Sequence, residues 1–129
     1  MKKSKSESTP RRDTAIEGYD AVSGQEGKLR PGREEFTTEW KEESWQFASA
    51  ANKDKFVADP ERYAPQFDGA CAFATSLGKD APGSPRHSLV RDGKLYFTLN
   101  PVARLLFRLL PGRAEKAHAH WLSRVSSSG

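Results

Sequence analysis

Two stretches of this chain alternate apolar and polar side chains on either side of a short polar turn, and they constrain the fold more than any other feature. Residues 36–40 and 44–48 flank the first turn, and residues 89–90 and 95–97 flank Asp92-Gly93. A period of two places successive side chains on opposite faces of a strand. Asp-Gly between two such runs is a strong signal for a tight turn. The sequence therefore predicts two antiparallel β-hairpins.

A short helix is expected after each hairpin. Ser49 and Asn100 can each cap a helix N-terminus, because a side-chain oxygen of Ser or Asn accepts a backbone N–H of the first turn. The helices that they begin are expected over residues 50–58 and 101–110, and two more are expected over residues 69–77 and 113–124. Together these elements predict an α+β fold, with a small antiparallel sheet of two β-hairpins packed with about four short helices.

The length and composition fit one domain with polar ends. The chain has 129 residues, of which 36% are hydrophobic, and this suits a single modest core. Residues 1–13 are polar and charged, so a disordered basic tail is expected there. A single domain is expected over residues 14–125, followed by a flexible tail over residues 126–129. No internal repeat is apparent on inspection.

The basic excess is concentrated at the two ends of the sequence. The net charge is +4, and residues 1–13 contribute +3, residues 14–100 contribute −3 and residues 101–129 contribute +4. A nucleic-acid-binding domain concentrates its positive charge on a folded face. Nucleic acid is therefore not expected as a partner.

Two further classes are excluded by simple counts. The single cysteine cannot form an internal disulfide or a site with several thiolates. No run approaches the roughly 20 apolar residues of a transmembrane helix, and no apolar run follows the first basic residues, as it does in a secretory signal. We expect no transmembrane segment and a cytoplasmic location.

The stretch from Phe47 to Tyr63 has the pattern Phe-Ala-Ser-x-x-Asn-x-x-x-Phe-x-x-x-Pro-x-x-Tyr. This pattern resembles the core signature of the YHS domain family, in which cysteines stand at the positions of Ala48 and Asn52. The resemblance extends to the small stand-alone branch of the family, through Gly18-Tyr19-Asp20, residues 69–74 and residues 92–96. It implies a YHS-like domain that binds a ligand or assists a partner.

The metal ligands of that family are absent from this chain. At the four positions where metal-binding members carry three cysteines and a methionine, the chain has Ser23, Gln25, Ala48 and Asn52. Transition metals of the soft class select thiolate and thioether ligands. The resemblance therefore implies a degenerate metal site, no cofactor and no bound metal. No catalytic residues are expected, and the leading hypothesis is a non-catalytic binding or accessory module with an unknown ligand.

Two alternative functions remain open. Cys71 stands near the start of an expected helix, where the helix dipole favours a thiolate, so a thiol-dependent redox or sensor role is one alternative. A small buried residue is the simpler interpretation of Cys71. Residual transition-metal binding through His118, His120 and carboxylates is the other alternative. On a helix, however, two side chains that are two positions apart point to nearly opposite faces.

Two candidate binding surfaces follow from the apolar residues. A small-molecule pocket is expected at Tyr19, Asp20, Tyr63, Gln66 and Phe67. An interaction helix within residues 102–110, which serves a protein partner or a homodimer, is expected through Leu105, Leu106, Leu109 and Leu110. The alternative for this helix is that it docks on the core of the domain while its two arginines face water.

Overall fold

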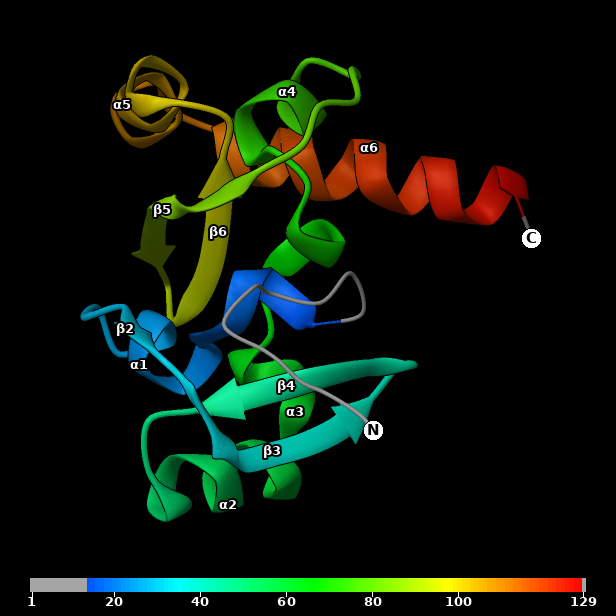
Figure 1. Cartoon of the computed structure of the whole chain (residues 1–129). Coiled ribbons are helices and arrows are strands. Elements are labelled where there is room, and N and C mark those ends of the chain that lie inside the picture. The colour runs from blue at the N-terminus through cyan, green and yellow to red at the C-terminus, as the bar shows by residue number, and fades with distance from the viewer. Residues whose placement is uncertain (1–13, 129) are drawn as a thin grey trace.

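The computed structural model describes the backbone of residues 14–128 and the side chains of residues 14–125. The tail predicted for residues 1–13 lies outside this range, as does Gly129. Figure 1 shows the arrangement of the elements. In chain order they are the 3₁₀ helix η1 (Ala15–Gly18), β1 (Tyr19–Asp20), α1 (Ala21–Gln25), β2 (Arg30–Pro31), β3 (Arg33–Trp40), β4 (Glu43–Phe47), α2 (Ala50–Ala58), α3 (Pro60–Tyr63), the 3₁₀ helix η2 (Gln66–Gly69), α4 (Ala72–Ser76), β5 (Ser84–Arg91), β6 (Lys94–Thr98), α5 (Pro101–Leu109) and α6 (Arg113–Ser128).

The predicted α+β fold is confirmed, and both hairpins form where the alternation placed them. Strand β3 pairs with β4, and β5 pairs with β6, each pair antiparallel. Residues 41–42 and 92–93 form the two-residue turns and have positive φ, as the tightest hairpin turns require. Both predicted caps also form, since Ser49 accepts a hydrogen bond from the N–H of Asn52 and Asn100 accepts one from the N–H of Ala103.

The two hairpins do not share one sheet, which corrects the sequence-based expectation. They belong to separate two-stranded sheets, and β1 and β2 form a third. Another segment of the chain pairs with one outer edge of each hairpin. Thr14 forms a parallel bridge with Ser44 beside β4, and Cys71 forms one with Phe97 beside β6. Six α-helices are present in the described residues, because two single-turn helices add to the expected four.

A constant offset of 51 residues relates the two halves of the chain. The register of the first hairpin shifts between Arg33 and Thr37, and that of the second shifts between Ser84 and Ser88, 51 positions later. The positive-φ positions that obey the same offset are residues 16–18 and 67–69, Gly27 and Gly78, and residues 41–42 and 92–93. The chain is therefore two copies of one structural unit, a first unit of residues 14–64 and a second unit of residues 65–128.

Few identical residues reveal this repeat in the sequence. Within the first unit, the residues that recur 51 positions later are Gly18, Ala21, Gly27, Lys28, Pro31, Gly32, Phe56, Pro60 and Arg62. Two of these positions require glycine because there is no space for a side chain. A Cβ at Gly32 would lie 2.6 Å from the backbone carbonyl of Gln46, and a Cβ at Gly83 would overlap the carbonyl oxygen of Gly69. The expectation that the chain has no internal repeat is therefore wrong.

Each unit buries its own core cluster, so the single core expected from the length is replaced by two. The buried residues of the first cluster are Ala15, Ala21, Val22, Trp45, Phe47, Phe56 and Ala64. Those of the second are Phe67, Ala72, Leu89, Tyr96, Phe107, Ala114 and Ala117. Helix α1 of the first unit contacts β5 and β6 of the second, which joins the units.

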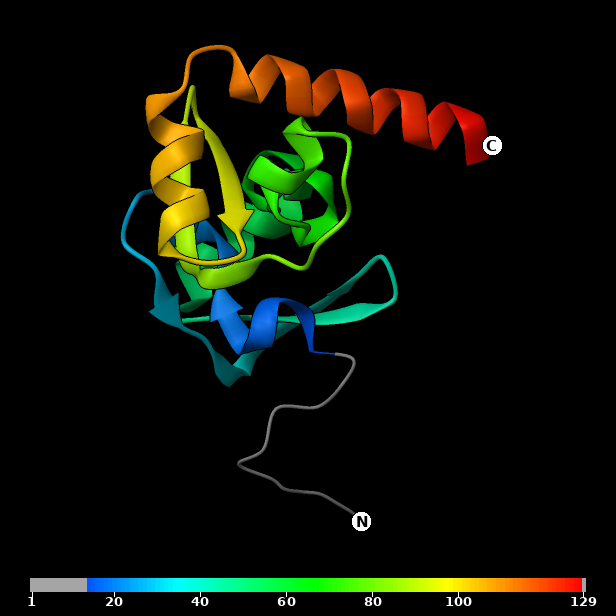
Figure 2. The ribbon, with the colours of Figure 1, turned by 90° about the horizontal axis from the view of Figure 1, so that it is seen from above.

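The C-terminal helix departs from the repeat by its length. Helix α6 follows α5 as α3 follows α2, but it continues to Ser128, so the backbone of residues 126–128 is helical where the sequence predicted a flexible tail. In both views its C-terminal part extends beyond the rest of the molecule (Figures 1 and 2). Within residues 14–128, none of the helices has the length and apolar character that crossing a bilayer demands.

Removing the ring of Phe56 tests the first core cluster. Phe56 is 1% exposed and contacts the rings of Trp40, Trp45 and Phe47 at centroid distances of 5.5, 4.9 and 5.0 Å. We expect Phe56→Ala to lower the free energy of unfolding by about 3–5 kcal/mol in chemical denaturation, because it leaves a cavity in a packed core. The adjacent Val57 is 56% exposed, so Val57→Ala should change it by less than about 0.5 kcal/mol. Equal effects of the two changes would contradict the assigned core.

Candidate functional site

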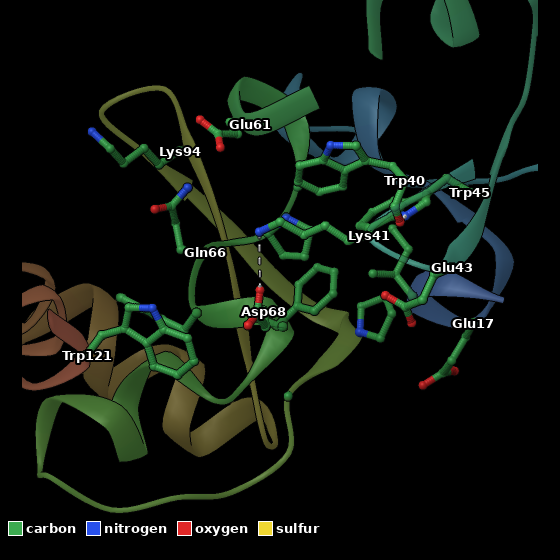
Figure 3. A pocket seen from close by; sticks show the side chains of 18 residues that line it. Glu17, Trp40, Lys41, Glu43, Trp45, Glu61, Gln66, Asp68, Lys94 and Trp121 are labelled. Atoms are coloured by element: carbon green, nitrogen blue, oxygen red, sulfur yellow. Dashed lines mark hydrogen bonds and ion pairs between the residues drawn. The ribbon is translucent and has the colours of Figure 1, made fainter. Parts of the chain in front are cut away.

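A cleft of about 870 Å³ lies between the two units. All three tryptophans of the chain line it, Trp40 and Trp45 from the first unit and Trp121 from the second. Figure 3 shows Trp121 on the opposite side of the cleft from Trp40 and Trp45. A concave site with aromatic walls and a few polar groups is the usual form of a small-molecule site. The cleft is therefore the candidate functional site.

The first unit supplies its wall through the β3–β4 hairpin. Trp40 and Trp45 meet edge to face with their ring centroids 5.5 Å apart, and the indole N–H of Trp45 donates to the carbonyl oxygen of Trp40 at 3.0 Å. Trp45 also stacks on the buried ring of Phe56. The hairpin and helix α2 thus pack both indoles of this wall against the first core cluster.

The second unit supplies its wall from η2 and α6. Phe67 is buried and has positive φ, and its ring centroid lies 5.7 Å from that of Trp121. Ile16 and Glu17 of the first unit are equivalent to Phe67 and Asp68, 51 residues later, and they also line the cleft. Both units thus present the same left-handed turn to the site.

The ionisable groups at the cleft are mostly acidic. Its lining includes four carboxylates and two lysines, namely Glu17, Glu43, Glu61, Asp68, Lys41 and Lys94. The Lys41 ammonium lies 4.0 Å from Oδ1 of Asp68 and 4.8 Å from the ring centroid of Trp40, and Figure 3 shows it reaching across toward Asp68. The site therefore favours a positive charge.

Of the five residues predicted to form a pocket, two lie at the cleft and three lie elsewhere. Gln66 and Phe67 line the cleft. Tyr63 packs against the first core cluster, Tyr19 pairs with β2, and Asp20 is fully buried. Trp40 and Trp121 were not among the residues predicted for the pocket, because nothing local indicates that two half-buried tryptophans 81 positions apart face one space. The 51-residue offset is the signal that points to a space between two like units.

Three of the four degenerate metal positions gather around Asp20. Its carboxylate accepts hydrogen bonds from the backbone N–H of Ser23 at 3.0 Å, the backbone N–H of Ala48 at 2.8 Å and the side-chain amide of Asn52 at 2.8 Å. Gln25 points elsewhere and donates to the carbonyl oxygen of Gly93. Three of the four positions at which the resemblance would place metal ligands thus surround a hydrogen-bonded carboxylate in this chain.

The described residues offer little to a metal ion. No three His, Cys, Asp or Glu side chains of residues 14–128 come together as a metal site would require. His118 is bonded to Tyr96, whereas His120 is exposed and lies beside Gly78. The residual-metal hypothesis therefore has no ligand set within this part of the chain.

Cys71 does in the second unit what Asp20 does in the first. It is the N-cap of α4, not a residue of the first helical turn, and its Sγ accepts from the N–H of Ala74 at 3.5 Å and the N–H of Leu99 at 3.2 Å. Asp20 makes the equivalent bonds 51 positions earlier. Cys71 is 1% exposed, and a redox-active thiol needs access to its oxidant. The geometry favours the structural interpretation.

A pair made of the buried Tyr96 and the half-buried His118 lies beside the wall of the second unit. The Tyr96 hydroxyl and Nε2 of His118 share a hydrogen bond of 2.9 Å, and the His118 ring packs 4.9 Å from that of Phe67. Burial lowers the pKa of His118 below its ordinary value of 6.5, and the nearby Lys94 lowers it further. Burial also raises the pKa of Tyr96. Both groups are therefore held neutral at physiological pH.

The leucine-rich helix α5 docks on the rest of the second unit by a face that is not made of its leucines. Ala103 and Phe107 are its buried residues, and Arg104 turns toward the body, where its Nε donates to the carbonyl oxygen of Ser88 at 2.7 Å. Leu106 is half-buried. The exposed residues are Leu105, Leu109 and Leu110, together with Val102 at the start of the helix. The alternative in which α5 docks on the core with both arginines facing water holds in part, because α5 does dock and Arg108 is exposed, but Arg104 is half-buried against Ser88.

Removing the Asp20 carboxylate should destabilise the fold. Asp20→Ala leaves two backbone N–H groups and the Asn52 amide without their acceptor, so we expect a loss of at least about 3 kcal/mol in the free energy of unfolding. Asp54→Ala, an exposed change of the same kind in α2, is the matched control and should have an effect below about 0.5 kcal/mol. A fully stable Asp20→Ala protein would show that the cluster does not hold the first unit together.

His118 should make stability depend on pH. A base whose pKa is lowered on folding contributes stability above its unfolded value of 6.5, and this is lost as the pH falls toward the lowered pKa. Between about pH 7.5 and 5, the free energy of unfolding of the natural protein should fall more steeply than that of His118→Gln. The exposed His120→Gln variant should retain the steeper slope. Identical slopes for all three proteins would contradict the prediction.

Comparisons of the chain with models of known families, with curated proteins and with solved structures gave no match. The resemblance to the YHS domain family stays a prediction.

Proposed function

We propose that this protein is a non-catalytic, YHS-like binding module that takes a small organic ligand in the cleft between its two units. The observation that carries the proposal is the convergence of all three tryptophans on one space of about 870 Å³. Most buried aromatic residues serve packing. Trp40 and Trp121, however, are half-buried and both present surface to the cleft.

The degenerate metal site supports binding without a metal cofactor. The hydrogen bonds that surround Asp20 satisfy its carboxylate internally, and the equivalent atoms in the second unit satisfy the Cys71 thiol. Two groups that are reactive in other proteins thus act as helix caps here. They brace the units that form the walls of the cleft.

Ligand-observed NMR with a library of soluble fragments tests this function. We expect fragments to bind the natural protein and to be excluded from Gln66→Trp, because Gln66 lines the cleft and a large ring there would fill it. Indole fluorescence should change with each bound fragment, since every tryptophan lines the site.

Lys28→Trp is the matched control, because it adds the same ring at an exposed loop position. It should bind fragments as the natural protein does. If no fragment binds, or if Gln66→Trp binds them equally well, the cleft is not the functional site.

A second candidate function is self-association through α5. Its outward stripe includes Val102 and Leu109, which are 65% and 62% exposed, and Leu105 lies between them on the same face. Helix α2 of the first unit provides an internal comparison. At the positions equivalent to Val102, Leu105, Leu106, Leu109 and Leu110 it carries Ala51, Asp54, Lys55, Ala58 and Asp59. The fold of the unit therefore does not require leucines there.

A second copy of the chain suits this stripe. The neighbouring arginines are directed to backbone oxygens of the same chain, Arg104 to Ser88 and Arg91 to Arg108. An isologous pair places the same apolar stripe on both partners. A nine-residue helix is short for independent membrane binding.

Sedimentation velocity of Leu105→Glu/Leu109→Glu tests the association. The natural chain should dimerise, and the variant should dissociate with a Kd at least about tenfold higher, because a charge is buried in the interface. Both positions are exposed, so the circular dichroism spectrum should be unchanged. The matched control is Asp54→Lys/Ala58→Glu in α2, which should leave the dimer intact. A monomeric natural chain, or an unaffected variant, would refute the idea.

A further inference from the structure

Two of the three indoles at the cleft are already covered by a cation from the same chain. The Lys41 ammonium lies 4.8 Å from the ring centroid of Trp40, and the Arg124 guanidinium lies 5.6 Å from that of Trp121. The face of an indole carries a negative potential, so a cation over it is attracted. Lys41 lines the cleft, whereas Arg124 lies outside its lining, so the cation over Trp40 is the one that marks a place for positive charge within the cleft.

The acidic groups of the lining add to this attraction. Four carboxylates and two lysines give the lining a net charge of −2. Asp68 and Glu17 occupy equivalent positions in the two units, so each unit brings a carboxylate to the site on its own left-handed turn. Aromatic faces together with carboxylates are the combination that recognises organic ammonium groups.

We propose that the cleft binds an organic cation of the alkylammonium class, with its charge between the face of Trp40 and the carboxylate of Asp68. This proposal rests on the proposed function, since it names the ligand class of the same cleft. The ring of Trp40 supplies the cation–π contact and Asp68 supplies the counter-charge. The apolar part of the ligand lies against Phe67 and Trp121.

Lys41 is the internal competitor for this position. Its ammonium lies between Trp40 and Asp68, where the ligand charge would lie, and its side chain is 58% exposed at the tip of the hairpin. The Lys41–Asp68 pair at 4.0 Å is a weak one on the surface. An incoming cation therefore displaces Lys41 into solvent at little cost and takes over both contacts.

Isothermal titration calorimetry with choline and with 3,3-dimethyl-1-butanol tests the proposal. The two probes have nearly the same shape, but only choline carries a charge. Choline should bind more tightly to the natural protein than the neutral probe does, by about twofold to thirtyfold. Its affinity should fall with added salt, because part of the attraction is electrostatic.

Two variants should shift choline affinity in opposite directions. Lys41→Gln removes the competitor and should tighten binding, whereas Asp68→Asn removes the counter-charge and should weaken it. Both side chains are more than half exposed, so neither change should affect folding. Asp54→Asn, an exposed change of charge on α2 outside the cleft, is the matched control and should leave the affinity unchanged.

Each other outcome has a defined meaning. Equal affinity for the two probes would overturn the cationic ligand and leave the cleft as a binding site. The same holds if choline fails to bind while neutral fragments still occupy the cleft. Tighter choline binding that Lys41→Gln and Asp68→Asn both leave unchanged would overturn the assigned position. Loss of all fragment binding is a failure of the proposed function itself.

Discussion

The buried carboxylate of Asp20 is the interaction on which the first unit depends. It caps helix α1 through the N–H of Ser23, and it ties the end of β4 and the start of α2 to the same point through Ala48 and Asn52. An acceptor with no exposure to solvent must have all its partners within the protein, because unpaired buried charge is strongly unfavourable. A helix, a hairpin and a second helix are therefore fixed relative to one another by one side chain.

In the second unit, the Cys71 thiol takes the place of the Asp20 carboxylate and is a weaker hydrogen-bond acceptor. Cys71 accepts two backbone N–H groups at the positions equivalent to those of Asp20, but Ala103 stands where the first unit has Asn52. A thiol is neutral and a weak acceptor, so it needs no third donor. The two caps show how a repeated backbone tolerates a change of chemistry when the partners change with it. They also explain why the single cysteine is buried.

The repeat places the candidate site as well. Two like units that pack against each other through α1 leave a cleft between their equivalent turns. Each unit contributes aromatic and acidic residues to it, and the differences between the units give the cleft its asymmetry, with Trp40 and Trp45 on one side and Trp121 on the other. In helix α5, by contrast, the two units differ: its outward face carries leucines where α2 has alanine and charged residues. Differences between equivalent positions thus separate what the fold needs from what a binding surface needs.

The sequence by itself determined the local structure. Alternation located both hairpins, and Ser49 and Asn100 located the starts of two helices, because strand periodicity, turn chemistry and capping depend on residues close together in the chain. The resemblance to the YHS family also drew attention to Ser23, Ala48 and Asn52, and these three residues do meet around one point. Nothing local indicated that this point is the carboxylate of Asp20.

Only the tertiary structure decided how the hairpins join, which face of α5 is buried and where the cleft lies. Those properties depend on contacts between residues distant in the chain, such as the bridge from Thr14 to Ser44 and the hydrogen bond from Arg104 to Ser88. Few identical residues mark the 51-residue repeat, because a backbone fixes glycine and proline at its turns but fixes only size and polarity at most other positions. The shape of each unit was therefore encoded locally, and the site arose from the way the two units pack.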